Sequence, residues 1–484
     1  MVDINVFFWF DVEDYITPES DEALKGILNI FEAHLVKGTF KIVGEKLRAL
    51  KRRDRRDIIN ALRHQDIGYH TDFHSVHPTP AEYLKDLDWH QGAKEFERRE
   101  RAGFEELLDT FKRVSCYGQP GSSWAPHVYP VLQSWGLPVY LDYARHICLN
   151  DEPFWYCGVM NILNLKSNST RFEHHLGERG LSEAKEEFDA IRGRLMDAGG
   201  GEISICYHPC EFATYEFWDA VNFAKGANPD RSRWVPPRVK PLVVMEKELA
   251  LLSNYVEHIA SKPNVRCVTA KEAHEIYRDP TLDRSYRVED ILALADAIRP
   301  DITYVKCDKG YLTPAEVFYL IISLLKTAYR YGKECNRFSV ESVSNFEVRI
   351  THPIYGAIER SASQPVPCSI GEFLAACEEA CVFMESEWRL PNSIRAGDES
   401  WTPEEFLLAM SAVLKSLSRG GNTFAPTESV STEGLIRPRE ATLQLERHVT
   451  DAEVWDWVIF PENFTAPSIV ELARLQTWSL KPPR

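Results

Sequence analysis

The first 280 residues alternate short apolar stretches with longer amphipathic ones. In residues 4–10 (INVFFWF) the apolar run Val6–Phe10 follows Ile4 and Asn5, which predicts a buried strand. Residues 21–35 (DEALKGILNIFEAHL) place apolar side chains at helical spacing. The same alternation predicts further strands at 37–44, 66–71, 138–143, 201–207 and 264–269, and a charged helix over 45–65. Repeated β–α units indicate parallel strands joined by right-handed crossovers.

The pattern changes near Ser285, where apolar helices follow short strand-like or looped stretches. Three helices are expected to begin at Thr313, Ser369 and Thr402, because each of these residues can cap a helix and has an acid three positions later. The three segments are similar to the short helical repeats of some cell-wall-binding modules. An ordinary helical accessory domain with well-capped helices is the favoured explanation. We therefore expect two domains, residues 1–284 and 285–484.

Composition limits the function classes. The chain has 484 residues, of which 44% are hydrophobic and 26% charged, so large cores can form. The formal net charge of −16 argues against nucleic acid or an anionic membrane as the main partner. The start of the chain lacks the features of a signal peptide. The 11 cysteines are scattered with no CxxC pair, which favours free thiols in a reducing cytoplasm.

Polar residues of catalytic type follow three of the predicted strands. Asp11, Glu13 and Asp14 end the first, His70 ends the strand at 66–71, and His208 follows the strand at 201–207. Functional sites of parallel α/β folds are built at the carboxyl ends of strands. Asp11 and Glu13 point the same way if the strand continues, while Asp14 lies in the following turn. Adjacent carboxylates need a compensating cation, although an acidic cap for the next helix is the simpler alternative.

The stretch YHTDFHSVHP (69–78) contains three histidines. His70 and His74 are four residues apart, so both rings can face one ion, and His74 with His77 is a competing pair. A carboxylate and two imidazoles suit Zn²⁺, and also Co²⁺, Ni²⁺ or Fe²⁺. The alternative is a polar loop that is rich in histidine, and His208 could equally bond to backbone at a strand end.

The order of the motifs FDVED, GTFKIVGEK, HTDFH, YGQPGSSWAP, ICYHP and VRCVTAKEA over residues 3–280 resembles the polysaccharide deacetylase (NodB-homology, carbohydrate esterase 4) superfamily. The resemblance implies a distorted (β/α) barrel of the NodB-homology type, followed here by an α-rich accessory domain.

The resemblance also assigns roles. It implies that Asp11 is the general base, that Asp14 binds a divalent metal ion with His70 and His74, and that His208 is the acid that protonates the leaving nitrogen. Glu13 could take the role assigned to Asp14. Zinc is the metal expected first.

One departure from the family pattern lies in its third motif, which usually carries an arginine that orients the base. Here Gly118 or Gln119 occupies that position. Without the guanidinium, either Asp11 has a different pKa or another cation such as Arg145 replaces it. Backbone N–H groups of the GQPGSS loop could hold the oxyanion. The residues expected to bind substrate are Tyr69, Gln119, Gly121, Trp124 and Tyr207.

The expected function is metal-dependent hydrolysis of a C–N amide bond, with deacetylation of an N-acetyl amino sugar or glycoconjugate as the first reaction. The altered third motif keeps two alternatives open, namely hydrolysis of a cyclic amide or imide and removal of a formyl group. A non-catalytic carbohydrate-binding protein on the same fold is the third alternative. The expected partner is a small-molecule or carbohydrate substrate, and residues 285–484 could bind a second copy or another protein.

Overall fold

The computed structural model describes residues 3–163, 165–335, 339–362, 368–397, 399–418, 441–450 and 454–483. These residues form two compact units. Unit 1 comprises Met1–Pro153, Val159–Tyr277 and Thr450–Ile469, and unit 2 comprises Phe154–Gly158, Arg278–Val449 and Val470–Arg484.

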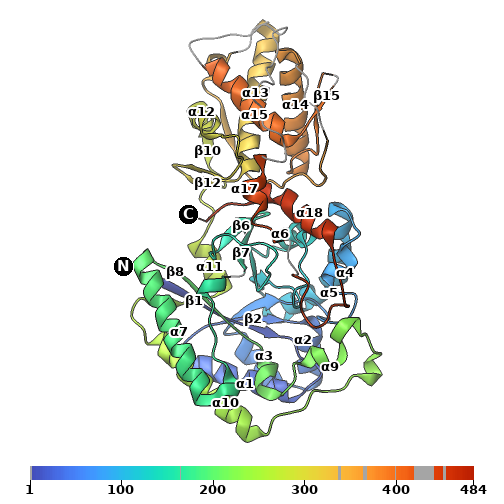
Figure 1. The fold of residues 1–484 in the computed structure, drawn as a ribbon, viewed down its shortest axis with the longest axis vertical. Helices are drawn as coiled ribbons and strands as arrows, with labels where there is room; N and C mark the ends of the chain where they lie inside the picture. Colours follow the sequence, from blue (N-terminus) through green and yellow to red (C-terminus); the bar gives the residue numbers. More distant parts are fainter. Residues whose placement is uncertain are drawn as a thin grey trace. The chain divides into compact units, whose positions relative to one another are not determined.

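Unit 1 is built on a parallel sheet, as expected from the alternating pattern, and the sheet curls into a half-barrel, as the resemblance implied (Figure 1). Its strands run in the spatial order β7-β5-β4-β3-β2-β1-β8, and β9 pairs with the first residues of β1. The strands are β1 (Ile4–Val12), β2 (Thr39–Ile42), β3 (Asp66–Tyr69), β4 (Cys116–Tyr117), β5 (Val139–Asp142), β7 (Val159–Leu163), β8 (Gly201–Tyr207) and β9 (Val265–Cys267).

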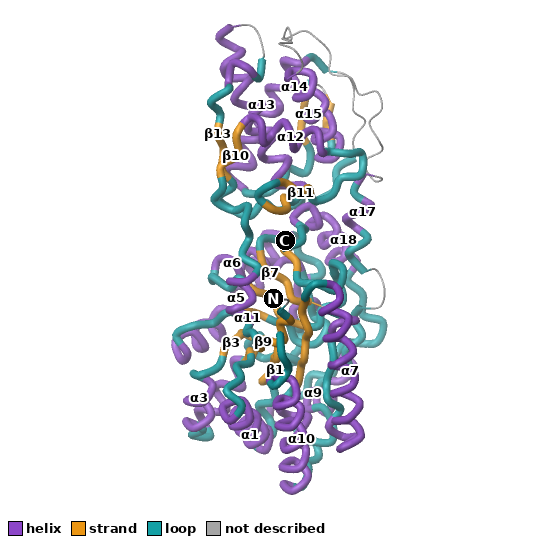
Figure 2. The backbone as a smooth tube through the Cα atoms, turned by 90° about the vertical axis from the view of Figure 1, so that its left-hand side faces the viewer, coloured by secondary structure: helices purple, strands orange, loops and turns teal. Residues whose placement is uncertain are grey.

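Helices cover the sheet of unit 1, and α1, α7 and α10 are the long ones beside β1 and β8 (Figure 2). β1 is buried on both faces because its apolar residues meet these helices on one side and the barrel interior on the other. The helices are α1 (Glu19–Ala33), α2 (Gly44–Arg52), α3 (Arg56–Leu62), α4 (Pro80–Leu84), α5 (Trp89–Phe111), α6 (Tyr129–Ser134), α7 (Gly177–Ala198), α8 (Pro209–Ala213), α9 (Trp218–Asn222), α10 (Leu242–Ala260) and α11 (Ala270–Ile276).

The single helix expected over 45–65 is instead two helices, α2 and α3. The chain turns between them at Asp54, whose φ of 52° is left-handed and cannot continue an α-helix. The amide of Arg55 bonds to the carbonyl of Leu50, which closes the first helix. Because charged residues flank the turn on both sides, the sequence pattern gave no sign that the helix is interrupted there.

Unit 2 is α-rich, as expected. Its longer helices pack around one apolar core, with α13 against α14 and α15. The expected helix starts are confirmed: Thr313, Ser369 and Thr402 cap α13, α14 and α15, and each exchanges hydrogen bonds with the acid three residues on. Its helices are α12 (Val288–Ala297), α13 (Pro314–Cys335), α14 (Ile370–Glu387), α15 (Pro403–Ser418) and α17 (Leu443–Glu446), with α18 (Pro467–Leu475) at the unit boundary.

Short strands connect the helices of unit 2. They form the antiparallel pairs β10 (Ser285–Arg287) with β13 (Glu347–Arg349), β11 (Val305–Cys307) with β12 (Gly310–Leu312), and β14 (Ile394–Ala396) with β15 (Glu399–Trp401). β6 (Phe154–Tyr156) comes from the earlier part of the chain, and its Trp155 exchanges backbone hydrogen bonds with Lys481 within the same unit.

The two units do not divide the chain at residue 284. Thr450–Ile469 returns to unit 1, where the ring of Trp455 lies 4.4 Å from that of His146 and the amide of Thr450 bonds to the carbonyl of His146. Aromatic packing therefore holds the segment Thr450–Ile469 in unit 1. Hydrophobic periodicity depends on neighbouring residues, so it cannot predict such a contact.

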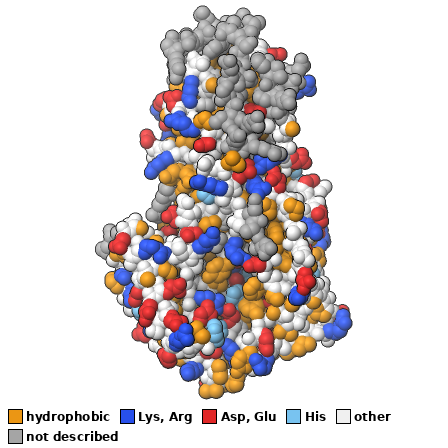
Figure 3. Space-filling view, viewed as in Figure 1, with side chains coloured by type: hydrophobic (Ala, Val, Ile, Leu, Met, Phe, Trp, Pro, Cys, Tyr) orange, Lys and Arg blue, Asp and Glu red, His pale blue; other side chains and the backbone are white. Residues whose placement is uncertain are grey.

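The surface charges and the helices exclude few classes of function by themselves. Acidic and basic side chains are interspersed over the face shown in Figure 3. Among the residues that the structure describes, no helix combines the length and apolar content needed to cross a membrane.

Candidate metal centre and catalytic cleft

Strand register brings the sequence-predicted residues to one edge of the sheet. Asp11 on β1 lies opposite Lys41 on β2, and Ile42 of β2 lies opposite Tyr69, so His70 follows directly at that edge. On the other side of β1, Phe10 pairs with Tyr207, which places His208 next to Asp11. Three strand ends therefore converge, because all of these strands are parallel.

Glu13, His70 and His74 form a buried cluster. The Glu13 Oε2 atom lies 2.7 Å from Nε2 of His74 and 3.3 Å from Nε2 of His70. All three ligand-type atoms lie within 4.8 Å of one another. Each side chain is at most 2% exposed.

The neighbours of the two imidazoles decide which ring nitrogen carries the proton. Nδ1 of His70 is 3.0 Å from the carbonyl oxygen of Gly118, which can only accept, so Nδ1 donates. Nδ1 of His74 is 2.6 Å from Oγ of Ser75, and that hydroxyl donates to Asp219 at 3.0 Å. Both Nε2 atoms of the neutral rings are therefore left with a lone pair directed at Glu13.

These contacts fit a shared cation. The other Glu13 oxygen, Oε1, accepts from the indole of Trp218 at 2.8 Å, which turns Oε2 toward the imidazoles. Burial lowers the pKa of both histidines, that of His74 to about 4, so both are neutral at pH 7. Three acceptors with no proton between them repel unless a cation lies among them. One carboxylate and two imidazoles are a common zinc ligand set with positions left open.

Asp14 lies outside this cluster. Its Oδ1 accepts from the amides of Ile16 and Thr17, and its Oδ2 accepts from Ser20 at 2.5 Å. Asp14 thus stabilises the turn that leads into α1, which is the alternative role considered for these acids. The geometry brings Glu13, not Asp14, to His70 and His74.

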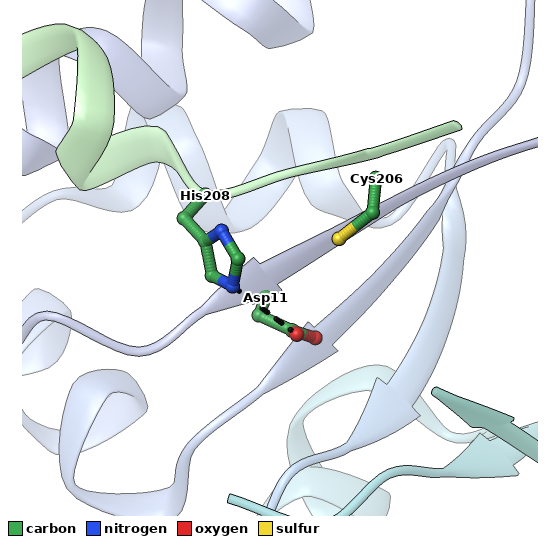
Figure 4. A group of neighbouring side chains, drawn as sticks. All are labelled: Asp11, Cys206 and His208. Carbon is green, nitrogen blue, oxygen red and sulfur yellow. Dashed lines mark ion pairs between the residues drawn. The ribbon is translucent and has the colours of Figure 1, made fainter. Parts of the chain in front are cut away.

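Asp11 and His208 face each other across the strand ends (Figure 4). Nε2 of His208 lies 3.5 Å from Asp11 Oδ2, and its Nδ1 lies 3.5 Å from Glu211 Oε2. Burial alone would lower the pKa of His208, but these two carboxylates raise it well above its ordinary value. Arg171 donates to both oxygens of Glu211 at 3.0 Å and keeps that acid ionised. His208 is thus a protonated group beside a carboxylate.

Cys206 also lies near Asp11 (Figure 4). Burial, together with the charge of Asp11, raises the pKa of its thiol well above the ordinary value. Cys206 belongs to a second group of metal-ligand type, with Asp11 and His208, which is separate from Glu13, His70 and His74.

Lys41 is the cation that compensates Asp11. Its fully buried Nζ lies 2.9 Å from Asp11 Oδ1, 2.5 Å from Asp142 Oδ2 and 4.4 Å from the ring centre of Trp9. Although burial raises the pKa of Asp11, His70 and Lys41 together hold it below its ordinary value. The expected substitute, Arg145, instead pairs with Asp456.

Gly118 explains why the third motif has no arginine. A Cβ atom at this position would lie 2.2 Å from Lys41 Nζ and 2.3 Å from Asp142 Oδ2. The space is therefore filled by a lysine from β2 and an aspartate from β5. The sequence signal was the lone charged residue within the apolar strand TFKI.

A cleft of about 350 Å³ opens over these groups. It is lined by Asp11, Glu13, His74, Gly121, Ser122, Asp142, Tyr143, Arg145, His208, Phe217, Asp456 and Trp457. Asp456 and Trp457 lie far from every motif in the sequence, and nothing in their local pattern indicated a role in the cleft.

Of the residues expected to bind substrate, the structure brings Gly121 to the cleft. Tyr69 is buried with its hydroxyl 2.6 Å from Glu100, and Tyr207 accepts from the amide of Phe172. Trp124 stacks on His146 in the core. Gln119 is buried, and its Nε2 donates to the carbonyl of Gly121, so it shapes the loop.

Comparison with known proteins bears on the fold. No protein-family model matches the sequence, and no curated protein matches it. Among solved structures, a putative polysaccharide deacetylase from Mycobacterium smegmatis matches at a TM-score of 0.37 and 16% identity, covering 57% of this chain and 91% of the other.

Two further matches have the same TM-score. A probable polysaccharide deacetylase from Pseudomonas aeruginosa PAO1 is 13% identical and covers 56% of this chain and 91% of its own. An allantoinase is 14% identical, and the match covers 56% of this chain and 90% of the allantoinase chain. Two of these three structures carry the name of the superfamily that the motifs resemble.

Proposed function

We propose that the chain is a metal-dependent hydrolase that cleaves a C–N amide bond, and that its substrate is an N-acetyl amino sugar, free or at the end of a glycoconjugate. The observation that carries the proposal is the convergence of Glu13, His70 and His74 on one point, with Asp11 and His208 beside it. An acid, a base and a cation site within one cleft are the parts that amide hydrolysis needs.

The residues of the chain have separate roles in this proposal. A divalent ion bound by Glu13, His70 and His74 would supply Lewis acidity toward the amide carbonyl. Asp11, kept ionised by Lys41, takes the proton of the attacking water. His208, kept protonated by Asp11 and Glu211, delivers a proton to the departing nitrogen. The groups begin in the protonation states that these roles require.

A second candidate is hydrolysis of a cyclic amide or imide. The size of the cleft favours it, because about 350 Å³ is near the lower limit for small-molecule sites and suits one ring. The same base and acid would act on a ring amide, whose nitrogen stays attached to the product.

The test is turnover by the full chain loaded with Zn²⁺. Acetate release from N-acetylglucosamine and ring opening of hydantoin are measured side by side. Chelated protein and the Asp11→Asn variant are the controls. We expect turnover of at least one substrate that disappears in both controls. Turnover that persists after complete metal removal would contradict the proposal, as would inactivity toward both substrates.

A further inference from the structure

The segment Val454–Phe464 forms one side of the cleft in unit 1, although it follows Tyr277 by more than a hundred residues in the chain. The amides of Lys225 and Gly226 donate to the carbonyls of Val458 and Ile459, each at 2.8 Å. The segment is therefore attached by backbone hydrogen bonds to the turn at Ala224–Gly226, which follows α9.

Trp457 joins this segment to the candidate metal ligands. Its indole Nε1 donates to Asp219 Oδ2 at 2.8 Å, and the same oxygen accepts from Ser75, the partner of His74. Asp219 is fully buried, and burial raises its pKa to about 6. Trp457 is thus positioned by the hydrogen bonds that orient the His74 ring.

The indole also makes close contact with both sides of the cleft. Its ring lies edge-on to Phe217 at 5.2 Å, and Phe217 lies edge-on to His208 at 5.0 Å. On the opposite side, a Cβ at Gly121 would come within 2.5 Å of Trp457 Cδ1. Gly121 has a φ of 50°, so its backbone approaches the indole in a way that other residues resist.

Asp456 closes the rim beside Trp457. Its carboxylate accepts from Ser122 at 3.1 Å and forms an ion pair with Arg145. Both members of the ion pair are 48% exposed and line the cleft, so they lie at its solvent-facing rim. Because Arg145 is already paired, the rim does not present a free cation for a charged polymer.

We propose that Asp456 and Trp457 are specificity-determining residues, which restrict the cleft to a substrate of single-ring size stacked on the indole. The inference deepens the proposed function and rests on it for the class of substrate. Aromatic rings suit the apolar face of a sugar or a planar cyclic amide. The volume of about 350 Å³ is near the lower end of the range for small-molecule sites.

The experiment measures binding separately from turnover. N-acetylglucosamine and triacetylchitotriose are titrated by calorimetry into full-length, metal-loaded protein that carries Asp11→Asn. We expect the monosaccharide to bind at least about tenfold more tightly. Adding Trp457→Ala should weaken the monosaccharide about tenfold, consistent with a lost stacking contact. Adding Asp456→Ala opens the rim without removing the indole. It should therefore reduce the difference in affinity between the two sugars, mainly because the trisaccharide binds more tightly.

Glu462→Gln is the matched control, because Glu462 belongs to the same segment and its 70% exposed side chain pairs with Lys225 away from the cleft. We expect it to bind like the parent. Equal affinity for both sugars, binding of neither, or an unchanged preference in both Trp457→Ala and Asp456→Ala would overturn the inference. Selective binding of the monosaccharide without turnover by the wild type would instead count against the proposed function alone.

Discussion

Replacing Lys41 with methionine tests the electrostatics of the cleft most severely. The side chain of Lys41 is 0% exposed and compensates Asp11 and Asp142, which are 7% and 6% exposed. Methionine keeps much of the volume but removes the cation that two buried carboxylates share, so Asp142 loses its counterion and Asp11 keeps only His208. Removing one partner of a buried ion pair typically costs about 3–5 kcal/mol of folding free energy. We expect a loss in that range for unit 1 at pH 7.5.

The loss should depend on pH in a defined direction. Without Lys41, the folded-state pKa of Asp142 rises further above the unfolded value of about 4. Burial already raises the pKa of Asp142 to about 7. A raised carboxyl pKa destabilises the folded state above the unfolded pKa, and protonation relieves the cost as the pH falls. The destabilisation should therefore be smaller at pH 5.5 than at pH 7.5.

Native-state hydrogen exchange with mass spectrometry measures this locally in chelated protein. Peptides from β1 and β2 report on the site, and peptides from α13 in unit 2 serve as an internal reference. Asp142→Asn is the matched control, because it leaves Lys41 and Asp11 as a balanced pair, and we expect it to cost about 1 kcal/mol. A loss below about 1 kcal/mol for Lys41→Met, or one that grows on acidification, would refute the reasoning.

Three further outcomes follow from the site. Asp11→Asn should keep bound metal but lower kcat by about 10²–10⁴-fold, and an unchanged rate would place the base elsewhere. Activity should persist as the pH rises through 6.5 and fall only at higher pH, because His208 must stay protonated. Glu211→Gln should shift this fall in activity to lower pH. If the fall stays at the same pH, His208 is excluded as the acid. Gly118→Ala should destabilise the fold by about 1–3 kcal/mol, since its Cβ meets Lys41 and Asp142, whereas a stability equal to wild type in thermal unfolding would contradict the close contact.

Local patterns predicted the framework of the fold well. The alternation of apolar runs and amphipathic stretches indicated the parallel sheet, and the caps at Thr313, Ser369 and Thr402 marked three helix starts, because both signals depend on residues a few positions apart. The turn at Asp54 was missed, since a left-handed residue between two charged helices leaves the helical spacing almost unchanged.

The site was predictable only in part, because its charge balance depends on pairing across strands. Strand alternation places Asp11 and Glu13 on one side, and the structure bears this geometry out, whereas Asp14 is used by the next turn. Lys41 compensates Asp11 through the register of β1 with β2, which no local motif encodes. The approach of Trp457 depends on tertiary packing of a segment some 450 residues after Asp11.

Metal content of the purified full-length chain tests the central claim most directly. Elemental analysis after dialysis against Zn²⁺ and gel filtration should find one ion per chain in the wild type and in Asp14→Asn. The account predicts that Glu13→Gln and His74→Ala lose that ion while their circular dichroism stays native. An ion retained in both of these variants, or lost in Asp14→Asn with an intact fold, would contradict the assignment of Glu13, His70 and His74 as the ligands.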